Sequence, residues 1–125
     1  MTGTKENYIP EQLDIIYINF DPTKGREIKK RRPALVMSST VYNRRTGFVV
    51  VCPITSTHRD LPMYVELHSH KIHGQVNAIQ LRSLDYLKSN RQIEFVESAP
   101  IQDFERTAKI IKDIFNFDDL ISNFS

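Results

Sequence analysis

Short apolar segments at close spacing constrain the fold of this chain more than any other feature of its sequence. Each is rich in β-branched or aromatic residues, which favour strands, and turn-forming residues separate them. In the first, Ile16, Ile18 and Phe20 fall on one face. In the fourth, polar and apolar residues alternate, as in a strand with one exposed face. The segments that predict strands are residues 13–20, 33–39, 47–55, 62–69, 75–84 and 92–98.

The chain ends in a pattern of a different kind. From Pro100 onward, apolar residues recur at steps of three and four, which predicts an amphipathic helix with proline in its first turn. This stripe consists of Ile101, Phe104, Ala108, Ile111 and Phe115, widened by Ile110 and Ile114. Residues 41–47, VYNRRTG, predict a turn. Short strands followed by one helix predict a mainly β fold, a small barrel of about six or seven strands with a C-terminal helix packed on it.

Length and composition are those of a single-domain globular protein. The 125 residues, 40% hydrophobic and 26% charged, suffice for one modest core. We expect residues 1–11 to form a loose tail and residues 12–125 a single domain. No apolar run is long enough to span a bilayer, and the N-terminus lacks the pattern of a signal peptide, which predicts a cytoplasmic protein. Cys52, the single cysteine, lies in an apolar segment and is expected to be a buried hydrophobe and not a nucleophile.

Residues 21–36, DPTKGREIKKRRPALV, concentrate positive charge. Between residues 24 and 45 there are eight cations and one acid, a local balance of +7, although the whole chain carries only +2. From residue 94 onward, seven acids and three cations give a balance of −4. This uneven distribution favours a local anion site over a general attraction to nucleic acid. A solvated lysine-rich loop explains the charge alone equally well.

The residues of this basic stretch differ in what they offer an anion. Gly25 lets a phosphate approach the backbone closely, and the arginine side chains have planar forks that match phosphate oxygens. Arg32 adjoins Pro33 at a strand entrance, so its side chain should be the best oriented. Glu27 is the exception, because a carboxylate weakens a polyanion site. It is either a partner in an exposed ion pair or a proton acceptor kept charged by the cations.

Two further motifs carry polar side chains. Residues 53–57, PITST, place three hydroxyls at a strand end, which suits phosphate binding but is also common at strand ends. Residues 68–73, HSHKIH, have a spacing that superficially resembles a metal site, yet no cysteine or acid completes a ligand set, so no metal is predicted. Histidines could instead act as acid and base on RNA, and His58, directly after the hydroxyl cluster, is the best placed.

Residues 14–57 combine these features in a characteristic order. DIIYINFDPTKGREIKKRRPALVMSSTVYNRRTGFVVVCPITST contains a first strand, a D-P-[ST]-x-G-x-E loop, R-P-x-[LV]-[LV], a Y-N turn and a V-x-P-x-T strand end. The later AIQLRSLD fits a Q-[VIL]-[RK]-[ST]-[LI] segment. This combination resembles the MazF/PemK family of toxin endoribonucleases of type II toxin–antitoxin systems. The resemblance extends over residues 13–86, and the predicted C-terminal helix fits the family plan.

The resemblance implies an SH3-like barrel that dimerises and cleaves single-stranded RNA, chiefly mRNA, at a short motif, with no metal or other cofactor. The family's catalytic arginine, threonine and glutamate fall on Arg32, Thr55 and Glu27. In the implied reaction the RNA 2′-hydroxyl attacks the phosphate, which leaves a 2′,3′-cyclic phosphate (or 3′-phosphate) and a 5′-hydroxyl. Glu27 would assist deprotonation, Arg32 would stabilise the phosphorane charge, and Thr55 would hold a phosphate oxygen.

Other positions are expected to contact RNA or depart from the family pattern. Arg45 and Arg59 are candidates for reading bases. Some family members have an acid where Ile79 stands and a tryptophan where Tyr17 stands, and we expect Tyr17 to pack in the core. The residues expected to bind RNA are Lys24, Gly25, Arg26, Lys29, Arg31, Arg44, Ser56, Thr57, His58, Asn77, Gln80 and Arg82.

The basic groove could equally hold an acidic, disordered segment of an antitoxin. The resemblance implies such a cognate partner, of the MazE/PemI type. Two other hypotheses use the same barrel: a non-catalytic SH3-like module that grips RNA or a peptide, and a gyrase-poisoning toxin. The pairing of R-P with V-x-P-x-T argues against the gyrase poison.

Overall fold

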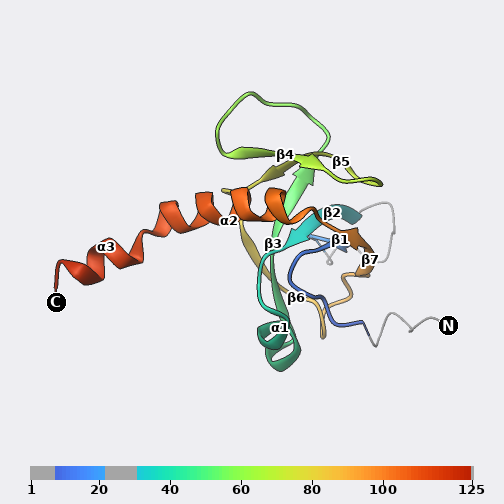
Figure 1. The fold of residues 1–125 in the computed structure, drawn as a ribbon. Helices are drawn as coiled ribbons and strands as arrows, with labels where there is room; N and C mark the ends of the chain where they lie inside the picture. Colours follow the sequence, from blue (N-terminus) through green and yellow to red (C-terminus); the bar gives the residue numbers. More distant parts are fainter. Residues whose placement is uncertain (1–7, 22–30, 125) are drawn as a thin grey trace.

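The computed structural model describes residues 8–21 and 31–124, which form a curled antiparallel sheet with a long C-terminal helix (Figure 1). The strands are β1 (Asp14–Asn19), β2 (Arg31–Val36), β3 (Phe48–Thr55), β4 (Tyr64–His68), β5 (His73–Asn77), β6 (Arg82–Asp85) and β7 (Glu94–Ser98). The helices are α1 (Thr40–Thr46), α2 (Ile101–Phe115) and α3 (Phe117–Ser122). The predicted fold class, mainly β with a C-terminal helix, is confirmed, and the barrel takes the form of a curled half-barrel.

The central strand β3 changes partner along its length. On one side it pairs with β2, and on the other its first half pairs with β6 while Ile54 and Thr55 pair with β5. The path through the sheet is β4-β5-β3-β2-β1-β7, with β6 off this path. The change of partner lets the sheet curl over itself. The β2–β3 ladder ends at the pair Ala34–Pro53, a position where a residue without an N–H is tolerated.

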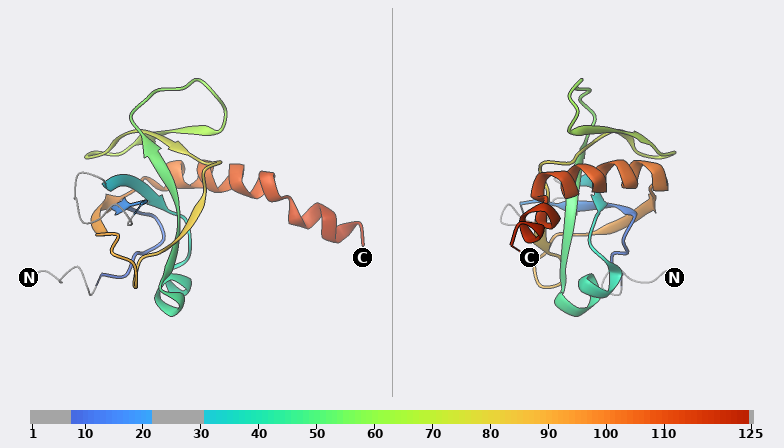
Figure 2. Two further views of the ribbon diagram at one scale, coloured as in Figure 1. Left: turned by 180° about the vertical axis from the view of Figure 1, so that it is seen from behind. Right: turned by 60° about the vertical axis from the view of Figure 1, so that its left-hand side comes forward.

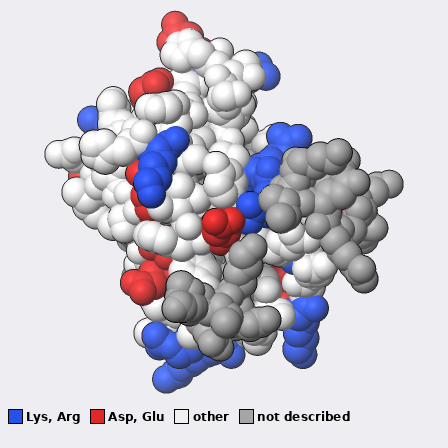
Figure 3. All heavy atoms as spheres, turned by 90° about the vertical axis from the view of Figure 1, so that its right-hand side faces the viewer, with Lys and Arg blue, Asp and Glu red and all other residues white. Residues whose placement is uncertain are grey.

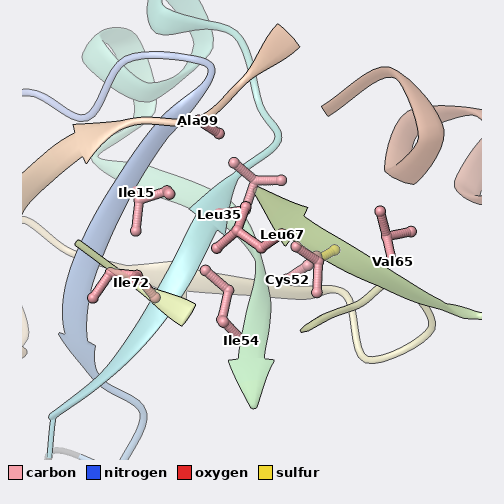
Figure 4. Packing of buried hydrophobic residues seen from close by; sticks show 9 residues of the cluster. Ile15, Leu35, Cys52, Ile54, Val65, Leu67, Ile72 and Ala99 are labelled. Carbon is pink, nitrogen blue, oxygen red and sulfur yellow. The ribbon is translucent and has the colours of Figure 1, made fainter. Parts of the chain in front are cut away.

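Successive side chains of the strands enter two different apolar clusters. In β1, Ile15 enters the first cluster, whereas Ile16 and Ile18 enter the second. Figure 4 shows the first cluster, in which side chains from β1, β2, β3 and β4 converge. Phe104 and Ile111 of α2 pack against this cluster. Burial on both faces is the reason why residues 34–36 of β2 and most of β3 are continuously apolar.

Helix α2 confirms the predicted amphipathic helix, but part of its predicted apolar stripe is exposed and not buried. Its fully buried residues are Asp103 and Thr107. The expected stripe residues Ile101, Ile114 and Phe115 are at least half exposed. The helix is about 22 Å long, and Figure 2 shows that its C-terminal part and α3 project beyond the sheet. The periodicity therefore predicted the helix correctly, while the sheet is too narrow to cover its whole apolar face.

Two sequence predictions about local structure are wrong. Residues 41–47 are not a turn: Thr40–Thr46 form the helix α1, in which the Ser39 side chain caps the N-terminus and Gly47, at φ 73°, ends it. Residues 75–84 are not one strand, because a turn after Asn77 separates β5 from β6. This break allows β5 and β6 to pair with different halves of β3.

The described residues before β1 are packed against the fold and do not form a loose tail. The Tyr8 hydroxyl donates a hydrogen bond to the Asp14 carboxylate, and Pro10 is buried. Burial, reinforced by Asp14, raises the pKa of Tyr8. The Asn43 side-chain amide of α1 donates to the Pro10 carbonyl at 2.8 Å. Among residues 8–21 and 31–124, no helix has the length and apolar character needed to span a membrane.

Candidate active site

A cleft of about 550 Å³ opens at the rim of the half-barrel, where β1 ends and β2 begins. Sheet register assembles it: Arg32 pairs with Ile18 of β1, and Arg82 of β6 pairs with Val51 of β3. The cleft is lined by Phe20, Asp21, Arg32, Pro53, Gln80 and Arg82. Three of the residues expected from the sequence, Arg32, Gln80 and Arg82, therefore lie together, although they come from different elements.

The arginines of the cleft are positioned differently from their neighbours. The Arg82 guanidinium lies 5.1 Å from the centre of the Phe20 ring, a stacking geometry that holds it over the cleft wall. The Arg32 side chain is exposed, and among the described residues no hydrogen bond or ion pair engages it. Two guanidinium groups that face one open volume can bind a phosphate group through several donors.

Arg31 does not share this role, because adjacent strand residues point to opposite faces. Its side chain is only 11% exposed and forms an ion pair with Glu94 at 2.7 Å. It also donates to the Gln92 carbonyl at 3.2 Å and lies 5.2 Å from the Tyr17 ring centre. The structure thus places Arg31, which the sequence predicted to bind RNA, in an internal contact between β2 and β7 and not among the residues that line the cleft.

Thr55 lies two residues beyond Pro53 on β3 and therefore on the same face of the strand. Its Oγ1 accepts a hydrogen bond from the Thr57 N–H at 3.1 Å. Behind it, Gly74 of β5 adopts φ +143°, and a Cβ at that position would lie 2.2 Å from the Thr55 carbonyl oxygen. This close backbone approach fixes the end of β3, so Thr55 is held in place by residues distant in sequence.

Comparison with known proteins identifies the group to which this fold and cleft belong. The family described as "PemK-like, MazF-like toxin of type II toxin-antitoxin system" matches residues 11–115. The chain belongs to this family. The resemblance seen in the sequence motifs is thereby confirmed.

Individual relatives agree with this assignment. The endoribonuclease toxin MazF of Escherichia coli K12 is 38% identical over 77 residues, which are 62% of this chain and 69% of that protein. The endoribonuclease toxin ChpB of the same strain is 37% identical over 81 residues, 60% of this chain and 69% of that protein. The crystal structure of MazF from Deinococcus radiodurans matches with a TM-score of 0.77 at 33% identity, covering 88% of this chain and 99% of that one. A MazE–MazF crystal structure from the same organism matches at 0.76 and 31%, with the same coverage.

Part of the predicted site of this MazF/PemK toxin lies outside the described residues. This holds for Lys24, Gly25, Arg26, Glu27 and Lys29. In the view of Figure 3, Lys and Arg atoms gather on the described surface, with Asp and Glu atoms close to them. Among its described lining residues, the cleft itself has two cations, Arg32 and Arg82, and one acid, Asp21.

Other predicted RNA-binding residues of the toxin are scattered. Ser56, Thr57 and His58 follow Thr55 in an exposed loop. Asn77 is buried, and its amide donates to the Tyr64 hydroxyl at 3.4 Å. Arg44 belongs to α1, which precedes β3, so the length of that strand, about 23 Å, separates it from Thr55. Arg44 is thus at the wrong end of β3 to act in the cleft.

Sequence reasoning missed two charged residues of the site. Asp21 lines the cleft, and its place directly after the first strand was a signal available in the motif. Arg91 carried no such signal. It donates to the Asn19 carbonyl at 3.0 Å and to the Phe20 carbonyl at 3.2 Å, which anchors the end of β1. Burial, with the neighbouring Arg82 cation, lowers the pKa of Arg91.

The histidines and the cysteine do not form a second site. His68 Nδ1 lies 2.9 Å from the buried Asp103 carboxylate, a contact that ties β4 to α2. Among the described residues, no three His, Cys, Asp or Glu side chains are grouped as metal ligands. Cys52 is fully buried in the first apolar cluster, which confirms the expected buried hydrophobe, and burial raises its pKa to about 12.

Proposed function

We propose that this toxin is an endoribonuclease that cleaves single-stranded RNA by attack of the RNA's own 2′-hydroxyl. Membership of the family and the similarity to relatives named as endoribonucleases support this activity. The single structural observation that carries the mechanism is the cleft in which Arg32 and Arg82 face an open volume beside the end of β3. The products would be a 2′,3′-cyclic phosphate (or 3′-phosphate) and a 5′-hydroxyl. Because the nucleophile belongs to RNA, no step of this mechanism requires a metal.

The residues of the cleft match the needs of this reaction. The pentacovalent intermediate gains negative charge on its equatorial oxygens, and a preorganised guanidinium stabilises such charge strongly in a partly desolvated cleft. We assign this role to Arg32, with Arg82 as a second cation of the same cleft. The Thr55 hydroxyl would donate to a phosphate oxygen. Its β5-braced backbone supports that assignment, since positioning within fractions of an ångström governs such catalysis.

A carboxylate is the proposed acceptor of the 2′-hydroxyl proton. Glu27 remains our first candidate because it matches the family motif. Asp21 is a second candidate, because it lines the cleft with both guanidinium groups. Ile79, which stands where some relatives carry an acid, is exposed in the turn before β6 and contributes no proton-transfer group. Comparing Glu27→Gln with Asp21→Asn distinguishes the two candidates, since the variant of the true base loses its activity.

The partners of the toxin follow from the same surface. We propose that the protein acts as a homodimer in the cytoplasm, where mRNA is available. We also propose that an acidic antitoxin of the MazE type neutralises it by covering the basic cleft. The Deinococcus radiodurans relative was crystallised as a MazE–MazF complex, which supports this partner.

The test is cleavage of a long single-stranded RNA by the purified protein with excess EDTA, followed by mapping of the fragment ends. We expect defined cuts with 5′-hydroxyl ends that EDTA does not suppress. Arg32→Ala should lower kcat by about 10²–10³-fold. Arg31→Ala is the matched control, because it removes the adjacent arginine, whose contacts are internal, and should lower stability more than activity. RNA that is bound but uncut would favour a non-catalytic module, and cleavage lost with EDTA would refute the metal-independent mechanism.

A further inference from the structure

The loop that follows Thr55 is held from behind by one buried glutamine. Gln75 lies on β5, is 4% exposed and pairs with Thr55 in the sheet register. Figure 1 shows the loop between β3 and β4 arching beside the β4–β5 hairpin. The Gln75 side chain reaches this loop and contacts both the backbone of Arg59 and the ring of His58.

The backbone of Arg59 determines the orientation of the Gln75 amide. The Arg59 N–H donates to Gln75 Oε1 at 2.9 Å, and Gln75 Nε2 donates to the Arg59 carbonyl at 3.0 Å. If the amide were flipped, its NH₂ group would face the Arg59 N–H and its oxygen would face the Arg59 carbonyl. Only the observed orientation therefore makes both hydrogen bonds. The amide therefore pairs with Arg59 as a neighbouring strand would, and it directs its second N–H toward His58.

This orientation selects one form of the neutral His58 ring. Gln75 Nε2 lies 3.1 Å from His58 Nδ1, and because an amide N–H can only donate, this contact is a hydrogen bond when Nδ1 is the acceptor and the ring proton resides on Nε2. The carboxylate of Glu66 is 3.4 Å from Gln75 Nε2 and 3.8 Å from His58 Nδ1. The His58 side chain is 72% exposed. Because Nδ1 contacts Gln75 and the side chain is largely exposed, Nε2 is the ring nitrogen left to offer an N–H to solvent, three residues after Thr55.

We infer that Gln75 is a positioning residue for RNA recognition, which fixes the loop 56–60 and makes His58 present its Nε2–H to a hydrogen-bond acceptor on the nucleotide. This inference rests on the proposed function. The acceptor is a base carbonyl or ring nitrogen, or else a phosphate oxygen. Arg59 is oriented by the same contacts, and its guanidinium lies 5.9 Å from the Tyr64 ring centre. These contacts give a defined geometry to the loop 56–60, which has no apolar core of its own.

The first test requires no RNA. Long-range ¹H–¹⁵N spectra, recorded at about pH 8, distinguish a protonated ring nitrogen from an acceptor. The native protein should show His58 with its proton on Nε2. Gln75→Glu keeps the acceptor for Arg59 N–H but replaces the donor by a carboxylate oxygen, so the proton should move to Nδ1. Gln102→Glu, on the exposed side of α2, is the control and should change nothing. An unchanged tautomer in Gln75→Glu would overturn the inference.

The second test measures cleavage. Gln75→Met, which preserves the length of the side chain but removes its hydrogen bonds, should lower kcat/KM by about 10-fold, chiefly through KM. On a His58→Ala background the same change should have a smaller effect, because the two residues act through one contact. Relaxed preference at one nucleotide identifies a base as the acceptor, whereas uniform loss at all sites identifies a phosphate. Unchanged kinetics and cut sites would refute the inference. An inactive native protein would refute the proposed function. The tautomer of His58 would still test whether Gln75 orients the ring.

Discussion

Replacing Gly74 by alanine tests whether the close approach of β5 to β3 holds the catalytic strand end. The new Cβ would lie 2.2 Å from the Thr55 carbonyl oxygen and 3.4 Å from the Ile54 side chain. Backbone atoms cannot rotate away, so the two strands must separate. The residue also has φ +143°, a conformation that costs a non-glycine residue about 1–3 kcal/mol.

The expected loss of stability follows from these two terms. Separating the strands disturbs the pairs Ile54–Val76 and Thr55–Gln75, and each hydrogen bond contributes about 0.5–1.5 kcal/mol. Together with the backbone strain, Gly74→Ala should cost about 3–5 kcal/mol. For a domain of this size that lowers Tm by about 10–20 °C. Below the new Tm, kcat should also fall, because Thr55 moves.

Gly47→Ala is the matched control in thermal unfolding by circular dichroism and in RNA cleavage. Gly47 also has positive φ, +73°, but its nearest neighbours are the Cβ and Cδ2 of Leu87 at 3.1 Å, and this residue is 61% exposed, so a shift of a few tenths of an ångström relieves the contact. This substitution should cost only about 1–2 kcal/mol. It lies at the other end of β3, so kcat should not change. Equal losses of Tm in the two variants, or native kcat in Gly74→Ala, would refute the argument.

Two further predictions concern titratable residues. Burial alone would raise the pKa of Glu97, but hydrogen bonds, among them one from Ser69 and one from the Ile72 N–H, outweigh it and lower that pKa. The native carboxyl therefore binds protons less readily than the unfolded one, so its stabilising effect is present above about pH 4.5 and disappears as pH falls further. The Tm difference between native protein and Glu97→Gln should shrink between about pH 6 and pH 3, while a constant difference would contradict this. Cys52, buried and with a pKa of about 12, should react with iodoacetamide at about pH 8 only when the protein unfolds, so its alkylation rate should follow urea unfolding. Rapid, complete alkylation of the native protein would contradict its burial.

The sequence predicted much of the fold because strand and helix periodicity are local properties. The alternation in residues 62–69 correctly predicted a strand with one exposed face, whose buried face carries Val65 and Leu67, and the spacing after Pro100 correctly predicted α2. The error at residues 41–47 has a local cause, since the Ser39 cap and the final Gly47 were present in the sequence but only about two helical turns separate them. The extent of burial along α2 was not predictable, because it depends on the width of the sheet beneath.

The candidate site shows the same division. Arg32 and Thr55 were predicted from motifs, and Arg32 lies in the cleft, but which of two adjacent arginines faces the cleft follows from the β1–β2 register. That register is set by burying two apolar faces at once, which no short segment encodes. The contribution of Arg91 likewise required the folded chain, since it contacts the end of β1 from 72 residues away.

What the sequence by itself determined is the chemistry available to this protein: its strand-forming segments, its terminal helix, its family and the residue types of the cleft. Only the tertiary structure decided how that chemistry is presented. In the folded chain Arg31 forms an ion pair with Glu94, and Gln75 holds the loop after Thr55 through the backbone of Arg59. The physical reason is that side-chain direction and hydrogen-bond partners are set by strand pairing and by contacts between distant segments, whereas residue type and local propensity are set by neighbours along the chain.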